Sequence, residues 1–151
     1  MRKIRKSGRN TKTSSSQANT HQMKLNTRLM DFSQKKELLD SVLAAAGTLT
    51  SEEDVQNKVV IPFLEKLGYS RQEMQFHETI EAVIGRKKVH GFSDITVRLS
   101  GKPTMIIDVK APAESFREEY VLQVVSYAKL IATPPAPIAI LTTGRDWEVH
   151  N

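Results

Sequence analysis

Residues 104–110 read TMIIDVK, a nearly continuous apolar run that ends in an aspartate, a valine and a lysine. Such a run is typical of a central strand that is covered on both faces of its sheet. In a strand, residues i and i+2 point to the same face, so Asp108 and Lys110 are expected to project side by side. The segment therefore predicts a buried strand that places two opposite charges at the rim of the core.

The apolar pattern also predicts an antiparallel hairpin between this strand and residues 92–99, FSDITVRL. The sequence SGKP between them is a turn signal. Three alternate residues on each strand are expected to face the core: Ile95, Val97 and Leu99 on the first, and Met105, Ile107 and Val109 on the second. All six of these residues have odd numbers, so the residue numbers of two partners that face each other across the hairpin add up to an even number. A hairpin with this register needs a loop with an odd number of residues. We therefore expect a three-residue loop, either 100–102 or 101–103.

The same register places Asp94 on the face that carries Asp108 and Lys110. Two neighbouring carboxylates repel each other unless a proton or a cation is shared between them. Magnesium suits such a pair, because it takes hard oxygen ligands and keeps several of its waters. The plainer alternatives are an exposed ion pair for Asp108 and Lys110, and a strand-start turn residue for Asp94. Taken together, the three residues predict a Mg²⁺ site at the end of the buried strand.

Helical and extended patterns alternate around this hairpin. Two helices are predicted first, over 31–47 and over 50–68, the second with an expected kink at Pro62. The remaining segments are predicted as a strand at 75–85, a turn or loop at 86–91, a helix at 115–132, a buried strand at 138–144 and a last strand at 146–150. The order α-α-β-β-β-α-β-β predicts an α/β domain in which helices flank a mixed β-sheet.

Composition limits what else the chain can be. Its 151 residues suit one domain, and the absence of cysteine excludes disulfides and thiolate metal sites. No apolar run is long enough to span a membrane, so we expect a cytoplasmic protein.

The net charge of +5 is unevenly distributed along the chain. Residues 1–30 hold eight of the 22 Lys and Arg residues and none of the 17 acids, which leaves 14 basic and 17 acidic groups in residues 31–151. We interpret 1–30 as a disordered basic tail and 31–151 as the folded domain. The tail is either a solubilising extension or an arm that attracts phosphates.

Several stretches together resemble a known family. SD at 93–94, a hairpin and IIDVK at 106–110 resemble the PD-(D/E)XK nuclease signature. Most of the body resembles the nuclease domain at the N-terminus of type I restriction enzyme motor subunits. That resemblance is carried by four stretches: SEEDVQNKVVIPFLEKLGY at 51–69, GKPTMIIDVKAP at 101–112, QVVSY at 123–127 as a Gln-x-x-x-Tyr motif, and IAILTTGRDWEVH at 138–150.

The resemblance implies a restriction-endonuclease-like fold and a role for each matching residue. Asp94 and Asp108 would bind Mg²⁺, or Mn²⁺ in its place, with the carbonyl of Val109 as a further ligand. Lys110 would hold the attacking water and stabilise charge on the phosphorus. Glu52 would orient the lysine or a metal-bound water.

Other positions leave alternatives open. Gln123 and Tyr127 lie one helical turn apart and could both reach the site or the DNA backbone, although Tyr127 also falls on the apolar stripe of its helix. Glu53 competes with Glu52 as the first-helix acid, and Glu52 fits the family pattern better. Ser93 stands in the proline position, and Asp108 stands where this family more often has glutamate.

Two functions from different classes follow. The first is a metal-dependent DNA endonuclease with DNA, and other subunits of a restriction system, as partners. The second is a catalytically inactive nuclease-like module that binds nucleic acid or a protein. Intact Asp94, Asp108 and Lys110 favour the first. The oligomeric state stays open, with a homodimer as one possibility.

Overall fold

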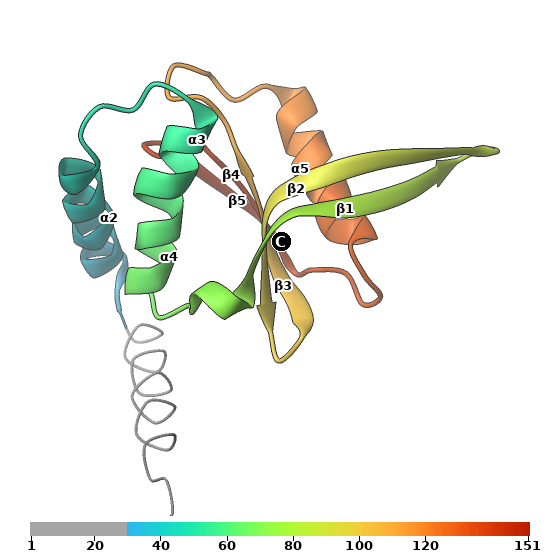
Figure 1. Ribbon diagram of the computed structural model, residues 1–151, viewed down its shortest axis with the longest axis horizontal. Coiled ribbons are helices and arrows are strands. Elements are labelled where there is room, and N and C mark those ends of the chain that lie inside the picture. Colours follow the sequence, from blue (N-terminus) through green and yellow to red (C-terminus); the bar gives the residue numbers. More distant parts are fainter. Residues whose placement is uncertain (1–29) are drawn as a thin grey trace, which may run out of the picture.

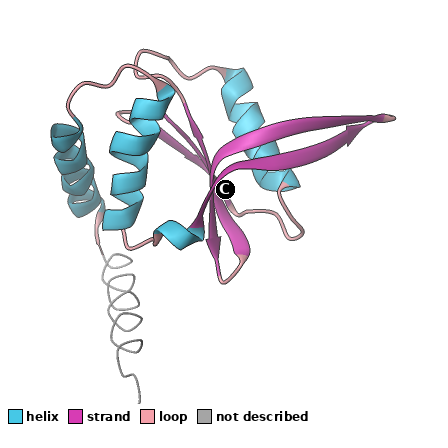
Figure 2. Ribbon diagram, viewed as in Figure 1, coloured by secondary structure: helices cyan, strands magenta, loops and turns pink. Residues whose placement is uncertain are grey.

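A computed structural model describes residues 30–151 as a five-stranded mixed sheet flanked by helices (Figures 1 and 2). The strands are β1 (Met74–Ile84), β2 (Lys87–Leu99), β3 (Lys102–Val109), β4 (Ile138–Thr142) and β5 (Trp147–His150), in the spatial order β1-β2-β3-β4-β5. Only β3 and β4 pair in parallel. This confirms the predicted fold class and element order. The tail predicted for residues 1–30 lies, apart from Met30, outside the described residues.

In residues 30–151, six helical segments accompany the sheet. They are α2 (Phe32–Ala46), α3 (Glu52–Val55), the π-helical η1 (Gln56–Val60), α4 (Ile61–Lys66), the 3₁₀ turn η2 (Arg71–Glu73) and α5 (Glu118–Leu130). Asp31 caps α2 in a capping box with Gln34, and Ser51 caps α3. None of the helices in the described part of the chain is long and apolar enough to cross a membrane.

The predicted second helix contains a change of helix type rather than one uniform pattern. The π-helical turn Gln56–Val60 leads directly into α4, whose second residue is Pro62. Because proline has no N–H, it cannot donate the α-helical hydrogen bond to the carbonyl four residues earlier. A π turn is a common way to accommodate such an interruption within a helix.

The sheet is covered on both faces, and β3 lies at the centre of both cores. Ile107 and Val109 belong to the cluster that packs against α3, η1 and α4, whereas Ile106 belongs to the cluster under α5. Residues 105–109 of β3 are all buried, as the continuous apolar run predicted.

The β2–β3 hairpin keeps the predicted register but not the predicted loop. Ile95 faces Ile107 and Val97 faces Met105, so the predicted pairing of the core-facing residues is confirmed. The loop, however, has two residues, Ser100 and Gly101, both at positive φ. The parity is restored by a bulge, because β3 contributes one extra residue, Thr104, between the partners of Val97 and Arg98.

The predicted loop at 86–91 is wrong. The chain turns at Gly85 and Arg86, and Lys87 already begins β2. Gly85 has a φ of 63°, which suits the first position of a two-residue hairpin turn. As a result β1 and β2 form a long two-stranded arm that extends beyond the rest of the molecule (Figure 1).

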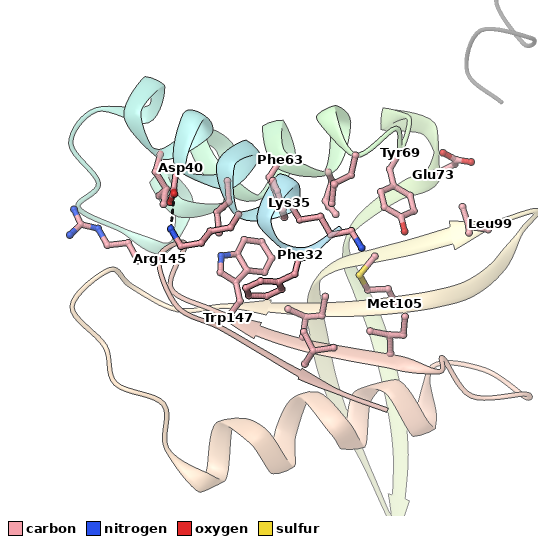
Figure 3. Close-up of a pocket in the computed structure, with 18 of the residues that line it drawn as sticks. Phe32, Lys35, Asp40, Phe63, Tyr69, Glu73, Leu99, Met105, Arg145 and Trp147 are labelled. Atoms are coloured by element: carbon pink, nitrogen blue, oxygen red, sulfur yellow. Dashed lines mark hydrogen bonds and ion pairs between the residues drawn. The ribbon is translucent and has the colours of Figure 1, made fainter. Parts of the chain in front are cut away.

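An apolar cavity of about 880 Å³ lies between α2 and the sheet (Figure 3). Phe63 and Trp147 contact each other in its wall, with ring centroids 5.3 Å apart. Neither Asp94, Asp108 nor Lys110 lines this cavity. Its walls carry mostly apolar side chains, so the cavity offers no chemistry of the kind predicted for the end of β3.

Candidate active site

The predicted site lies at a fork where β2 separates from β3. Pairing between the two strands extends as far as Ile95 and Ile107. Beyond that point, the Val109 backbone N–H donates to Asp94 Oδ2 at 2.6 Å, where a continuing ladder would have used a backbone carbonyl. The ladder between β1 and β2 also skips the pair of Asp94 with His77, which has a φ of 51°. Asp94 is therefore held by its side chain at a break in the sheet.

The surroundings of Asp94 disfavour its charge. Burial raises the pKa of its carboxyl to about 6, although the hydrogen bond from Val109 opposes the rise. The negative charges of Asp108 and Glu52 raise this pKa further, and the positive charge of Lys110 lowers it. A carboxyl with these neighbours gains from an additional cation.

Asp108 and Lys110 form a buried ion pair at the end of β3. Lys110 Nζ lies 2.7 Å from Asp108 Oδ2, and the two side chains are 13% and 5% exposed, so the exposed ion pair considered as an alternative is excluded. Burial lowers the pKa of Lys110, but the hydrogen bond and charge of Asp108, with the charges of Glu52 and Asp94, outweigh it and the pKa is raised. Lys110 is therefore a firmly charged ammonium.

Two further contacts hold Lys110 in place. Its backbone N–H donates to the Thr142 carbonyl of β4 at 2.8 Å. Its ammonium lies 4.7 Å from the centre of the Tyr120 ring on α5, a cation–π contact. The local sequence pattern does not indicate this contact, because it depends on how α5 packs against the end of β3.

Glu52 acts on the site through its charge. It is the first residue of α3, directly after the Ser51 cap, and its side chain is exposed. Its charge raises the pKa of both Asp94 and Lys110, whereas Glu53 is not among the charges that act on either group.

The donors present fit a small hard cation. In residues 30–151 no group of three or more His, Cys, Asp and Glu side chains is placed to hold a metal ion. A magnesium site needs fewer, because one or two carboxylates and retained waters suffice. Asp108 Oδ2 is buried, and its stabilising contact is the charged pair with Lys110 Nζ at 2.7 Å. Asp94 and Asp108 are thus suited to a cation that takes oxygen ligands.

Residues 51–151 match the family model described as the type I restriction enzyme R protein N terminus. The chain belongs to this family. The matched span begins at the cap of α3 and ends at the last residue, so it contains every predicted site residue. Comparisons with curated proteins and with solved structures found no significant match.

In this R-protein N-terminal domain, Gln123 and Tyr127 lie beside the arm. Gln123 Nε2 donates to Tyr127 Oη at 2.8 Å on α5, as their spacing allows. Neither residue forms a hydrogen bond or ion pair with Asp94, Asp108 or Lys110. Instead, the Tyr127 ring occupies the space above Gly91 of β2, where a Cβ would lie 2.5 Å from Oη and 2.6 Å from Cε1. The packing role considered for Tyr127 is therefore real, and Gln123 is exposed next to it.

Gly91→Ala is expected to destabilise the R-protein domain by about 1–3 kcal/mol, because the new methyl group overlaps the Tyr127 ring. Urea denaturation measures the cost. The same substitution in a Tyr127→Ala background should cost much less, since the overlapping ring is gone. Equal costs in the two backgrounds would show that Tyr127 does not pack on Gly91.

Proposed function

We propose that this protein is a Mg²⁺-dependent DNA endonuclease of the PD-(D/E)XK type that serves a type I restriction system. The observation that carries the proposal is the buried Asp108–Lys110 pair together with Asp94, whose carboxyl pKa is raised by burial, in a chain of the R-protein N-terminal family. A buried charged cluster at a sheet fork is costly to maintain, and a cation that binds the two carboxylates offsets that cost.

Asp94 and Asp108 would hold the Mg²⁺ ion, and the carbonyl of Val109 would complete the protein ligands. When bound, the ion supplies a water of lowered pKa and neutralises charge on the leaving oxygen. Asp94 would release the proton that its raised pKa retains near pH 6, because a bound cation favours the carboxylate form.

Lys110 would donate hydrogen bonds to the attacking water and to a phosphate oxygen. Its ammonium is kept charged by Asp108 and held in place by the Tyr120 ring, so it needs little reorganisation when charge develops on the phosphorus. Glu52 would orient the ammonium from the α3 side, since its charge acts on Lys110. Gln123 and Tyr127 would contact the DNA backbone next to the arm, and other restriction subunits would be further partners.

Incubation of the purified protein with plasmid DNA in Mg²⁺, Mn²⁺ or EDTA tests the proposal. Nicked or linear plasmid is expected with either metal and none with EDTA. Tight DNA binding without cleavage in either metal would favour the alternative, a nuclease-like module that binds nucleic acid without cutting it.

Lys110→Ala should abolish cleavage while metal binding stays at least as tight as in the wild type. The substitution removes a positive charge that lies 2.7 Å from Asp108 Oδ2 and competes with the cation for that oxygen. Calorimetric titration with Mn²⁺ measures the affinity. Lys129→Ala, which removes an exposed cation from α5, is the control and should change neither property. A clear loss of metal binding in a folded Lys110→Ala protein would contradict the catalytic role of Lys110 and show that it organises the carboxylates structurally.

A further inference from the structure

The β1–β2 arm has no partner over its outer part. Ile80 is 3% exposed and faces Gly91, which the Tyr127 ring covers, so the arm is anchored against α5 at this pair. Beyond this pair, up to the turn at Gly85, the two strands pair with each other and project away from the body (Figure 1). The strand that forms the arm continues directly into Asp94, so the arm rises from the candidate active site.

The tip of the arm is positively charged. Arg86, Lys87 and Lys88 are consecutive and exposed, and none of them takes part in an ion pair in the described structure. By contrast, residues 31–151 as a whole hold more acidic than basic groups. Three cations without an ion-pair partner on a projecting element attract phosphate locally. The acid on the outer arm, Glu81, lies opposite His90 rather than at the tip.

Apolar side chains accompany these cations, although the outer arm borders no core. The exposed ones on the outer arm are Val83 at 67%, Ile84 at 68% and Val89 at 40%, and Phe92, at the foot of the arm, is 57% exposed. A macromolecule that offers both phosphates and apolar groups could bind the cations of the arm and cover its exposed apolar side chains. The major groove of duplex DNA offers both, since phosphates line its edges and thymine methyl groups lie on its floor.

The dimensions of the arm also fit this groove. A two-stranded β-ribbon fits the width of the major groove, which is about 12 Å wide and about 8.5 Å deep. The free part of the arm, four residue steps from Ile80 to Ile84, is roughly 14 Å long at about 3.4 Å per residue. It is therefore long enough to lie in the groove, with its tip near the phosphates at the edge, while its foot stays on α5.

We infer that the β1–β2 arm is a DNA-binding element that enters the major groove of duplex DNA, with Arg86, Lys87 and Lys88 contacting the phosphates at its edges. This inference rests on the proposed function and adds to it the element that holds the duplex against Asp94, Asp108 and Lys110.

The test compares the full chain with a triple variant, Arg86→Gln, Lys87→Gln and Lys88→Gln. Fluorescence anisotropy with a short duplex, in EDTA so that no strand is cut, gives the affinity at several salt concentrations. The slope of log K against log salt should fall by up to about 2.7, because each lost phosphate contact removes about 0.9. The matched control, Lys35→Gln with Lys66→Gln and Lys102→Gln, removes three exposed cations from other elements and should leave the slope near the wild-type value.

An unchanged slope and affinity in the arm variant would overturn the inference, and is the result expected if the arm binds a protein subunit instead. The groove is tested separately by competition on wild-type protein. Methyl green, which occupies the major groove, should displace the protein, whereas netropsin in the minor groove should not; the reverse order would also overturn the inference. Because all these readouts are binding measured without metal, they are independent of whether wild-type protein cleaves DNA in Mg²⁺.

Discussion

Asp108→Ala is expected to reduce DNA cleavage by about 10³-fold or more. The reason is that a single carboxylate, Asp94, would remain to hold the cation, and metal catalysis supplies several kcal/mol, each 1.36 kcal/mol being tenfold in rate. The measurement is the initial rate of plasmid nicking in Mg²⁺ and in Mn²⁺. Asp40→Ala, which removes an exposed carboxylate from α2, is the control and should cut at the wild-type rate.

Loss of Asp108 also leaves the buried Lys110 ammonium without its ion-pair partner, which is destabilising in its own right. Asp108→Asn therefore accompanies the alanine variant, since it keeps the shape and an oxygen acceptor while removing the charge. A folded variant of either kind that cuts DNA as fast as the wild type would refute the assignment of the site to Asp108.

Asp94→Asn should stabilise the metal-free protein near neutral pH by about 3 kcal/mol. The folded-state pKa of Asp94, about 6, lies above its ordinary value of 3.8, so the fold disfavours the carboxylate. Each unit of such a shift is worth about 1.4 kcal/mol, and the amide oxygen can still accept the Val109 hydrogen bond.

The sign of the pH dependence follows from the direction of the shift. Between pH 3.8 and about 6 the folded state binds more protons at Asp94 than the unfolded state, so the contribution of this group to stability falls as pH rises through that window. Urea denaturation in EDTA should therefore show the advantage of Asp94→Asn at about pH 7.5, and a much smaller one near pH 4. A variant that is less stable than the wild type at neutral pH would mean that Asp94 supports the fold as an anion.

Much of the site could be predicted from the pattern of apolar residues. The continuous run before Asp108 predicted a strand buried on both faces, and the alternation of Ile95 and Val97 predicted the register with Ile107 and Met105. Both follow from local physics, because burial on one or two faces imposes a period that is visible in the residues themselves. The caps of α2 and α3 were predictable for the same reason, since a side-chain acceptor satisfies backbone donors within the same turn.

The arm was not predictable in this way. Lys87 to Gly91 form a regular strand, yet they face no core beyond Ile80, so no alternation of apolar and polar residues distinguishes them from a loop. Their extended structure comes from pairing with β1, which only the folded hairpin supplies. The two-residue loop at Ser100 and Gly101 was missed for a related reason, because a bulge elsewhere in β3 restored the parity that the apolar pattern requires.

The residue pattern along the chain was enough to predict the buried strand, the order of elements and the residues that gather at the end of β3. Three contacts were visible only once the chain was folded: Asp94 accepts the Val109 N–H at a fork, Tyr120 rather than Tyr127 meets Lys110, and Tyr127 packs on Gly91. The difference lies in the distance along the chain over which each kind of information acts. Periodicity records whether a residue is buried, because burial acts along one element, whereas the partner of a side chain depends on how α5 and the arm pack against the sheet.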